Sequence, residues 1–150
     1  PALVKEHPYR LLNRSTHIPV LTDESGYQAE LYYTLKSGNV ITLNTSLSKN
    51  VISESIRPVF REYFVEYQFY GKKNMSGKVF IDYANDPFIN EHHRYASGGS
   101  IDITHKKFNS NIEMEWQWIS RNTEIQQKAL NAYLGYTLSK TSKYIIGSLL

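Results

Sequence analysis

Residues 111–118, with the sequence NIEMEWQW, decide the fold. Apolar and polar residues alternate along this stretch without a break, and successive side chains of a β-strand point to opposite faces. The stretch therefore predicts a strand with an apolar face made of Ile112, Met114, Trp116 and Trp118. The opposite face, which we expect to lie in solvent, is made of Asn111, Glu113, Glu115 and Gln117.

The same alternation recurs elsewhere in pairs of segments that turns separate. Residues 27–35 and 41–47 flank the turn at 36–39, whose Gly38 can adopt a positive φ. A second hairpin is expected from residue 62 to residue 83, around a loop at 71–77. A third pairs Ile101 and Ile103 with the strand that ends at Trp118, and a fourth could join 133–138 to 144–149.

Two segments are typical of short helices. Thr123 and Gln126 match a capping box, and apolar residues follow at helical spacing as far as Tyr133. The second candidate is 51–60, which Pro58 interrupts.

Four hairpins supply eight strands, so we expect a mainly β fold in which residues 1–150 form one domain and residues 1–26 are irregular. Eight antiparallel strands of this length can close into a small lipocalin-like barrel, which has no exposed edge and can hold one small ligand. One or two short helices would accompany the barrel. A sandwich with open edges and a cone-shaped α+β fold remain alternatives.

Composition excludes several classes of site. The chain has no Cys, which rules out disulfides, thiolate metal ligands and a Cys nucleophile. The net charge of +3 comes with lysines spread over predicted turns, such as Lys72 and Lys73, so we expect no nucleic-acid face. No apolar run approaches the ~20 residues that span a bilayer, and membrane attachment is expected only through an N-terminal anchor absent from this sequence.

Aromatic residues are the most informative group, with 12 Tyr, 6 Phe and 2 Trp. Tyr and Trp have a polar tip that needs a partner when buried, so an interior rich in them indicates a cavity for a small amphipathic ligand. The residues expected to line this interior are Tyr33, Tyr63, Tyr67, Phe69, Tyr83, Trp116 and Trp118.

The polar stretch 86–99 contains the adjacent His92 and His93, which we expect to form a pH-responsive loop. Adjacent loop histidines usually point apart, so no metal site is expected there. Residues 97–100, SGGS, are interpreted as a connector rather than a phosphate-binding loop, because a strand and not a helix follows. Glu113 and Glu115 share a strand face without a recognisable base or nucleophile nearby, so no catalytic residue and no cofactor are predicted.

Three segments resemble the small periplasmic partner proteins of ToxR-type membrane-anchored transcription regulators, the ToxS, FidL and MyfF/PsaF kinds. They are LYYTLKSGNVITL at 31–43, REYFVEY at 61–67 and KYIIGSL at 143–149. The resemblance implies a lipocalin-like barrel anchored to the inner membrane. It also implies binding to the periplasmic domain of a regulator, and carries over no individual site residue.

The function expected from the sequence is therefore that of a non-enzymatic extracytoplasmic accessory or sensor subunit. Its partner would be the periplasmic domain of a regulator or a second copy of the chain, with an amphipathic ligand or acidification as the signal. The alternatives are a structural or adhesion module, such as a phage or pilus component, and an enzyme with an unrecognised site.

Overall fold

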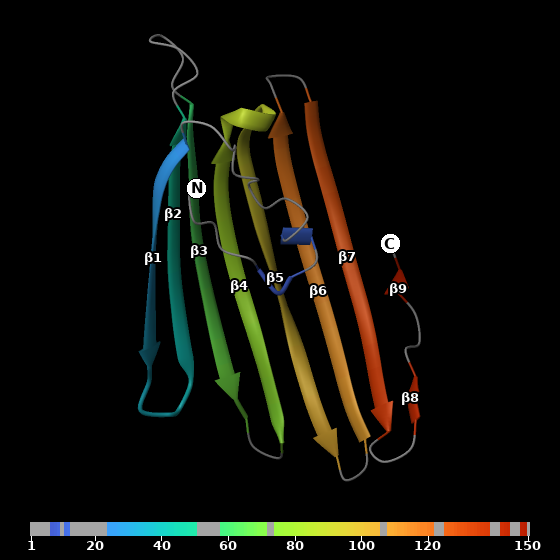
Figure 1. Cartoon of the computed structure of the whole chain (residues 1–150). Coiled ribbons are helices and arrows are strands. Elements are labelled where there is room, and N and C mark those ends of the chain that lie inside the picture. Colours follow the sequence, from blue (N-terminus) through green and yellow to red (C-terminus); the bar gives the residue numbers. More distant parts are fainter. Residues whose placement is uncertain are drawn as a thin grey trace.

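Seven long antiparallel strands follow one another in a meander, each paired with the next (Figure 1). The computed structural model describes residues 7–9, 11–12, 24–50, 58–71, 74–105, 108–121, 125–138, 142–144 and 148–149. The strands are β1 (Glu24–Thr34), β2 (Val40–Asn50), β3 (Val59–Tyr70), β4 (Met75–Asp86), β5 (Glu91–His105), β6 (Phe108–Arg121) and β7 (Ile125–Leu138). Two short strands, β8 (Ser142–Tyr144) and β9 (Ser148–Leu149), both pair with β7. The prediction of a mainly β, antiparallel fold is confirmed.

The first predicted hairpin is present with its turn. Gly38 has a φ of 85°, in the left-handed region that favours glycine, and its N–H donates to the carbonyl of Leu35 at 2.9 Å. The register places Leu31 opposite Leu43 and Tyr33 opposite Ile41. The predicted strands and the turn between them are therefore confirmed.

The predicted connector at 97–100 and the predicted loop at 86–99 are wrong in the same way. Only Pro87–Ile89 form a 3₁₀ turn, labelled η1, and β5 begins at Glu91 and runs straight through Gly98 and Gly99. A Cβ on Gly98 would lie 2.5 Å from the carbonyl oxygen of Met114, so glycine permits close strand packing here instead of marking a turn.

The helix predicted from Thr123 is also wrong over its described part, because Ile125–Leu138 form β7 and pair along their whole length with β6. Cross-strand pairing has overridden a capping pattern that is local. Thr123 itself lies outside the described residues. Of the other helix candidate, residues 51–57 also lie outside the described residues, and Val59 and Phe60 begin β3. Among the described helical segments, none has the length and hydropathy that a membrane-crossing helix requires.

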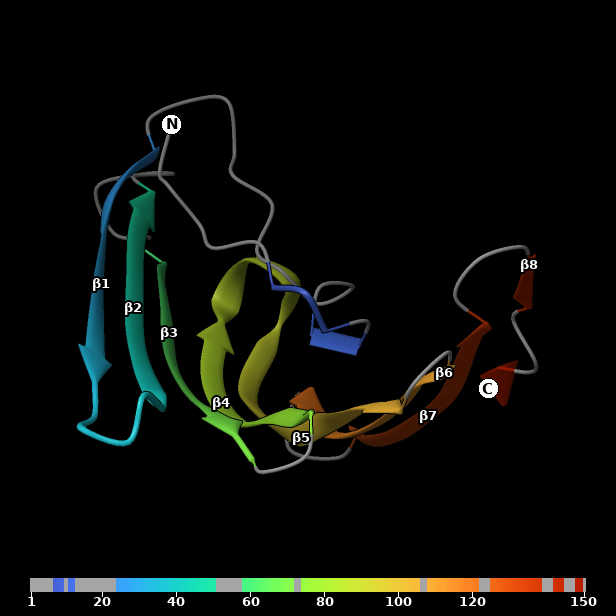
Figure 2. The same cartoon turned by 90° about the horizontal axis from the view of Figure 1, so that it is seen from below.

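The sheet is strongly curved and, over the described residues, open: β1 pairs with β2 alone (Figure 2). The described N-terminal residues, 7–9 and 11–12, lie inside the curve, against the concave face. A small buried cluster joins this N-terminal segment to β3, β4 and β5, and consists of Tyr9, Leu12, Phe64, Phe80 and Ala96. Tyr9 stacks on Phe80 with ring centroids 3.9 Å apart.

Candidate functional site

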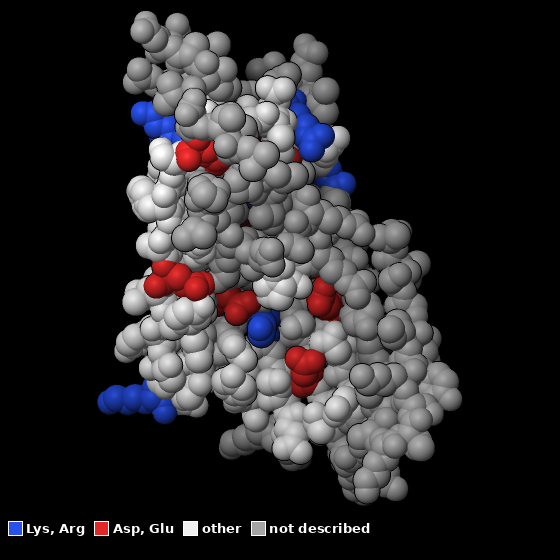
Figure 3. Space-filling view, in the orientation of Figure 1, with Lys and Arg blue, Asp and Glu red and all other residues white. Residues whose placement is uncertain are grey.

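The concave face of the sheet is predominantly polar and largely buried. Its buried polar residues on β2 to β6 are Thr42, Asn44, Ser46, Ser48, Asn50, Glu62, Asp82, Asp86, Glu91, Arg94, Glu115 and Gln117. Figure 3 views this side and shows acidic groups gathered over the middle of the sheet, with one basic group among them. This polar interior is the reverse of the apolar interior that the sequence predicts.

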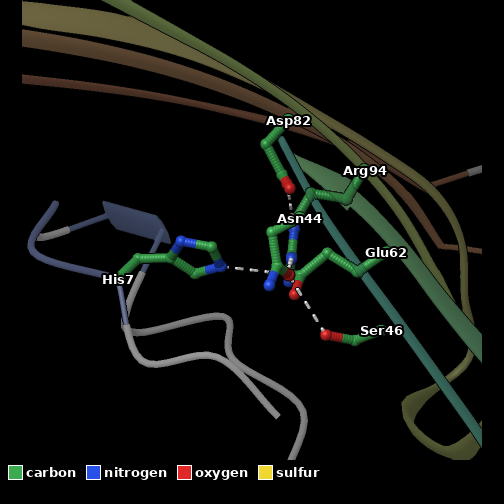
Figure 4. A network of polar contacts seen from close by, with 6 residues as sticks. All are labelled: His7, Asn44, Ser46, Glu62, Asp82 and Arg94. Atoms are coloured by element: carbon green, nitrogen blue, oxygen red, sulfur yellow. Dashed lines mark hydrogen bonds and ion pairs between the residues drawn. The ribbon is translucent and has the colours of Figure 1, made fainter. Parts of the chain in front are cut away.

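Arg94 lies at the centre of this polar face (Figure 4). Its side chain is fully buried, and its guanidinium contacts Glu62 Oε1 at 2.8 Å and Asp82 Oδ2 at 3.4 Å. Three neighbouring strands, β3, β4 and β5, thus each contribute one charged group. A buried charge requires such pairing, because removal from water without a partner is costly.

A β-bulge brings Glu91 to the same face as Arg94. Glu91 is opposite Arg121 of β6, whereas His93 is opposite Ser120, so His92 is an extra residue in β5. Without it Glu91 and Arg94, three positions apart, would point to opposite faces; with it both are buried on the concave side. A bulge within an unrecognised strand cannot be read from alternation, which is why the sequence did not indicate this pair.

The N-terminal segment binds the concave face through polar contacts from its side chains and backbone. His7 Nε2 lies 3.4 Å from Glu62 Oε1, the Tyr9 hydroxyl donates to Glu66 Oε2 at 2.5 Å, and the Leu11 N–H donates to Glu115 Oε2 at 2.9 Å. Burial and the adjacent Glu66 carboxylate raise the pKa of the Tyr9 hydroxyl well above its ordinary value, so it remains a donor.

His7, Glu62 and Asp82 form the group best suited to hold a metal ion among the described residues. One ligand atom from each lies within 4.8 Å of the others, and all three residues are buried. The prediction that the chain has no metal site did not consider this group, because its members are far apart in sequence. No local spacing could have revealed it.

The seven aromatic residues predicted to line a ligand cavity share one face, but that face is the convex one, away from the N-terminal segment. Tyr33 is 59% exposed, Tyr63 50% and Trp116 42%; Tyr67, Phe69, Tyr83 and Trp118 are half-buried. A depression of about 330 Å³ lies between β1, β2 and β3, and of these seven residues only Tyr63 lines it. Their inward orientation is therefore wrong, because alternation groups side chains by face without saying which face is covered.

The two predicted pH-responsive histidines are both exposed, at the start of β5 rather than in a loop. His93 Nδ1 lies 3.0 Å from the Tyr83 hydroxyl, and the His92 carbonyl accepts a hydrogen bond from the Asn85 side chain. A role for this pair in sensing pH stays a prediction.

The predicted solvent face of β6 is also reversed. Glu115 is 1% and Gln117 4% exposed, and both lie on the concave face with Glu113. Glu115 is instead the acceptor that fixes the backbone of the N-terminal segment.

Comparison with curated proteins and with solved structures finds no match for this chain. The resemblance to partner proteins of membrane-anchored regulators, and the expectation that the chain is not an enzyme, therefore stay predictions. One family does match, over residues 1–143, and it is described as a family of unknown function, DUF6029. The chain belongs to this DUF6029 family.

Proposed function

We propose that the sheet is part of the wall of a membrane-embedded β-barrel, with its convex face in contact with lipid and its concave face lining a polar interior that the N-terminal segment fills. The observation that carries the proposal is the inverted arrangement of the sheet: apolar side chains are exposed, and charged side chains are buried. A protein whose outer surface meets water has the opposite arrangement, whereas membrane β-barrels alternate apolar-out and polar-in.

Charge separates the two faces with little exception. Residues that are cross-strand partners in the register form a row, or level, across the sheet. On the convex face of β1 to β6, the rows from that of Tyr83 to that of Met75 include no Asp, Glu, Lys or Arg. Between the same two levels, the concave side of these strands holds Glu30, Glu66, Lys78, Asp82, Asp102, Glu113 and Glu115. A continuous uncharged, apolar face of this extent is typical of contact with hydrocarbon.

An aromatic row borders the apolar face on one side. Tyr63, Tyr83, Tyr95 and Trp118 are direct cross-strand neighbours on β3 to β6, with successive ring centroids 6.3, 5.1 and 5.5 Å apart. The next level outward is polar, with Arg61 opposite Asn85 and His93 opposite Ser120. Aromatic girdles of membrane proteins occupy this position, between hydrocarbon and water.

The height of the apolar face also fits a bilayer. From Tyr83 to Met75 the strand covers about 27 Å, which becomes roughly 20 Å along the membrane normal at the usual strand tilt of about 40°. Apolar bands of known membrane barrels are about 25 Å tall. Strands of 11 to 15 residues, as in β1 to β7, are long enough to cross it.

Closure into a barrel is part of the proposal. Unpaired backbone groups at a sheet edge are very costly in hydrocarbon, so β1 would have to pair with a further strand, from the same polypeptide or from a second copy. The curvature of the sheet favours such closure (Figure 2). The membrane contact proposed here differs from the N-terminal anchor expected from the sequence.

The two tryptophans allow a direct test. Trp118 lies in the aromatic row and Trp116 one level nearer the middle of the apolar face, about 5 Å deeper in the bilayer for a tilted strand. The variants Trp118→Phe and Trp116→Phe each leave one fluorophore. In vesicles of phospholipids brominated at defined acyl positions, we expect both to be quenched, with Trp116 quenched most by the more deeply brominated lipid.

Aqueous iodide provides the control. Little quenching of Trp116 by iodide, in the same vesicles, would support contact with hydrocarbon. Efficient quenching by iodide together with no quenching by any brominated lipid would show that the convex face lies in water, and the proposal would be wrong.

A further inference from the structure

The side chains of His7 from the N-terminal segment, Glu62 from β3 and Asp82 from β4 point toward one another (Figure 4). Their exposed fractions are 3%, 0% and 4%, so water does not surround any of them. Neither nitrogen of His7 has a hydrogen-bond partner among the described residues, although the ring points at the Glu62 carboxylate from 3.4 Å. Buried polar groups of proteins are normally hydrogen-bonded, so the burial of this imidazole needs an explanation.

Arg94 leaves part of each carboxylate unused. It contacts Glu62 through Oε1 and Asp82 through Oδ2, whereas Glu62 Oε2 and Asp82 Oδ1 are buried and have no hydrogen-bond partner in the part of the chain that the structure describes. The guanidinium thus fixes both carboxylates while one oxygen of each remains available. This is the geometry of an outer partner that orients metal ligands.

We propose that His7, Glu62 and Asp82 bind a first-row divalent metal ion such as Zn²⁺ or Mn²⁺. An imidazole nitrogen with two carboxylate oxygens suits these ions, whereas Ca²⁺ and Mg²⁺ prefer oxygen ligands alone. The ligand atoms, within 4.8 Å of one another, need to approach only slightly to surround an ion at about 2.1 Å from each. The inference does not depend on the proposed membrane location.

Charge favours a cation at this position. Two carboxylates, of Glu62 and Asp82, face the single Arg94 guanidinium, and Glu66 and Glu115 lie on the same face near the N-terminal segment. A divalent ion would offset that excess and would join the N-terminal segment to two strands. Metal occupancy would then strengthen the closure of the polar interior by this segment.

Zn²⁺ titration of the folded full chain, followed by calorimetry, tests the site. We expect one ion per chain for the wild type and at least tenfold weaker binding for His7→Ala. This variant removes a ligand without leaving a buried charge unpaired. The double variant His92→Ala/His93→Ala, which removes two exposed imidazoles, should bind as the wild type does.

A second variant guards against misfolding. Asp82→Asn keeps the size of the side chain and should also weaken Zn²⁺ binding, with circular dichroism confirming that the sheet is intact. The absence of stoichiometric binding to the wild type, unchanged binding in His7→Ala, or Ca²⁺ binding as tight as Zn²⁺ would each overturn the proposal. None of these results would alter the tryptophan quenching that tests the membrane location.

Discussion

The carboxylate of Glu115 is buried on the concave face and accepts the backbone N–H of Leu11 at 2.9 Å. Glu115→Ala would leave that N–H without an acceptor, so we expect a loss of about 1–3 kcal/mol in the free energy of unfolding. Urea titration of the wild type and the variant, each folded in vesicles, measures this difference in the free energy of unfolding. Glu115→Gln, which keeps a side-chain acceptor, should retain much of the stability.

Asp102 provides the matched control, because its carboxylate accepts a hydrogen bond from the Asn111 side chain on an exposed part of the sheet. Asp102→Ala should change the free energy of unfolding by less than about 0.5 kcal/mol. Equal effects of the Glu115→Ala and Asp102→Ala substitutions would mean that the N-terminal segment does not depend on the Glu115 carboxylate.

Strand β5 depends on two glycines that allow its neighbours to approach. A Cβ on Gly99 would lie 2.3 Å from the carbonyl oxygen of Lys78, which is backbone of β4 and cannot rotate away. Gly99→Ala should therefore cost about 1–3 kcal/mol through forced separation of β4 and β5. We expect a lower denaturant midpoint and faster hydrogen exchange of the amides in these two strands. Ser97→Ala, in the same strand, is the control and should change neither. Wild-type exchange rates in Gly99→Ala would contradict the close packing.

The inverted distribution of polarity is a property of the whole molecule, and a lysine placed at two heights on β6 tests it. Met114 is 59% exposed in the middle of the convex face, whereas Ser120 lies beyond the aromatic row. If the convex face contacts lipid, Met114→Lys should cost about 2–4 kcal/mol and Ser120→Lys only about 0–1 kcal/mol. The measurement is the free energy of folding into vesicles. A negligible cost for Met114→Lys, as expected at a surface in water, would contradict the membrane location.

Local patterns were enough to predict much of the sheet. Alternation at 27–35, 41–47 and 111–118, with the Gly38 turn between the first two, identified strands and one complete hairpin. These patterns failed at Gly98 and Gly99, because glycines are turn signals when only neighbours in sequence are considered. They failed at His92 because a bulge breaks the alternation. They failed also at Ile125–Leu138, where pairing with β6 outweighed a capping pattern.

Alternation along a strand is enough to group side chains by face, because successive residues of an extended, pleated backbone point to opposite sides. Which of the two faces is covered depends on the tertiary fold. The direction of curvature and the docking of residues 7–9 and 11–12 placed Glu115 inside and Trp116 outside, and assembled His7, Glu62, Asp82 and Arg94 from four separate segments. Burial depends on contacts between segments distant in sequence, and the alternation of one strand contains no information about them.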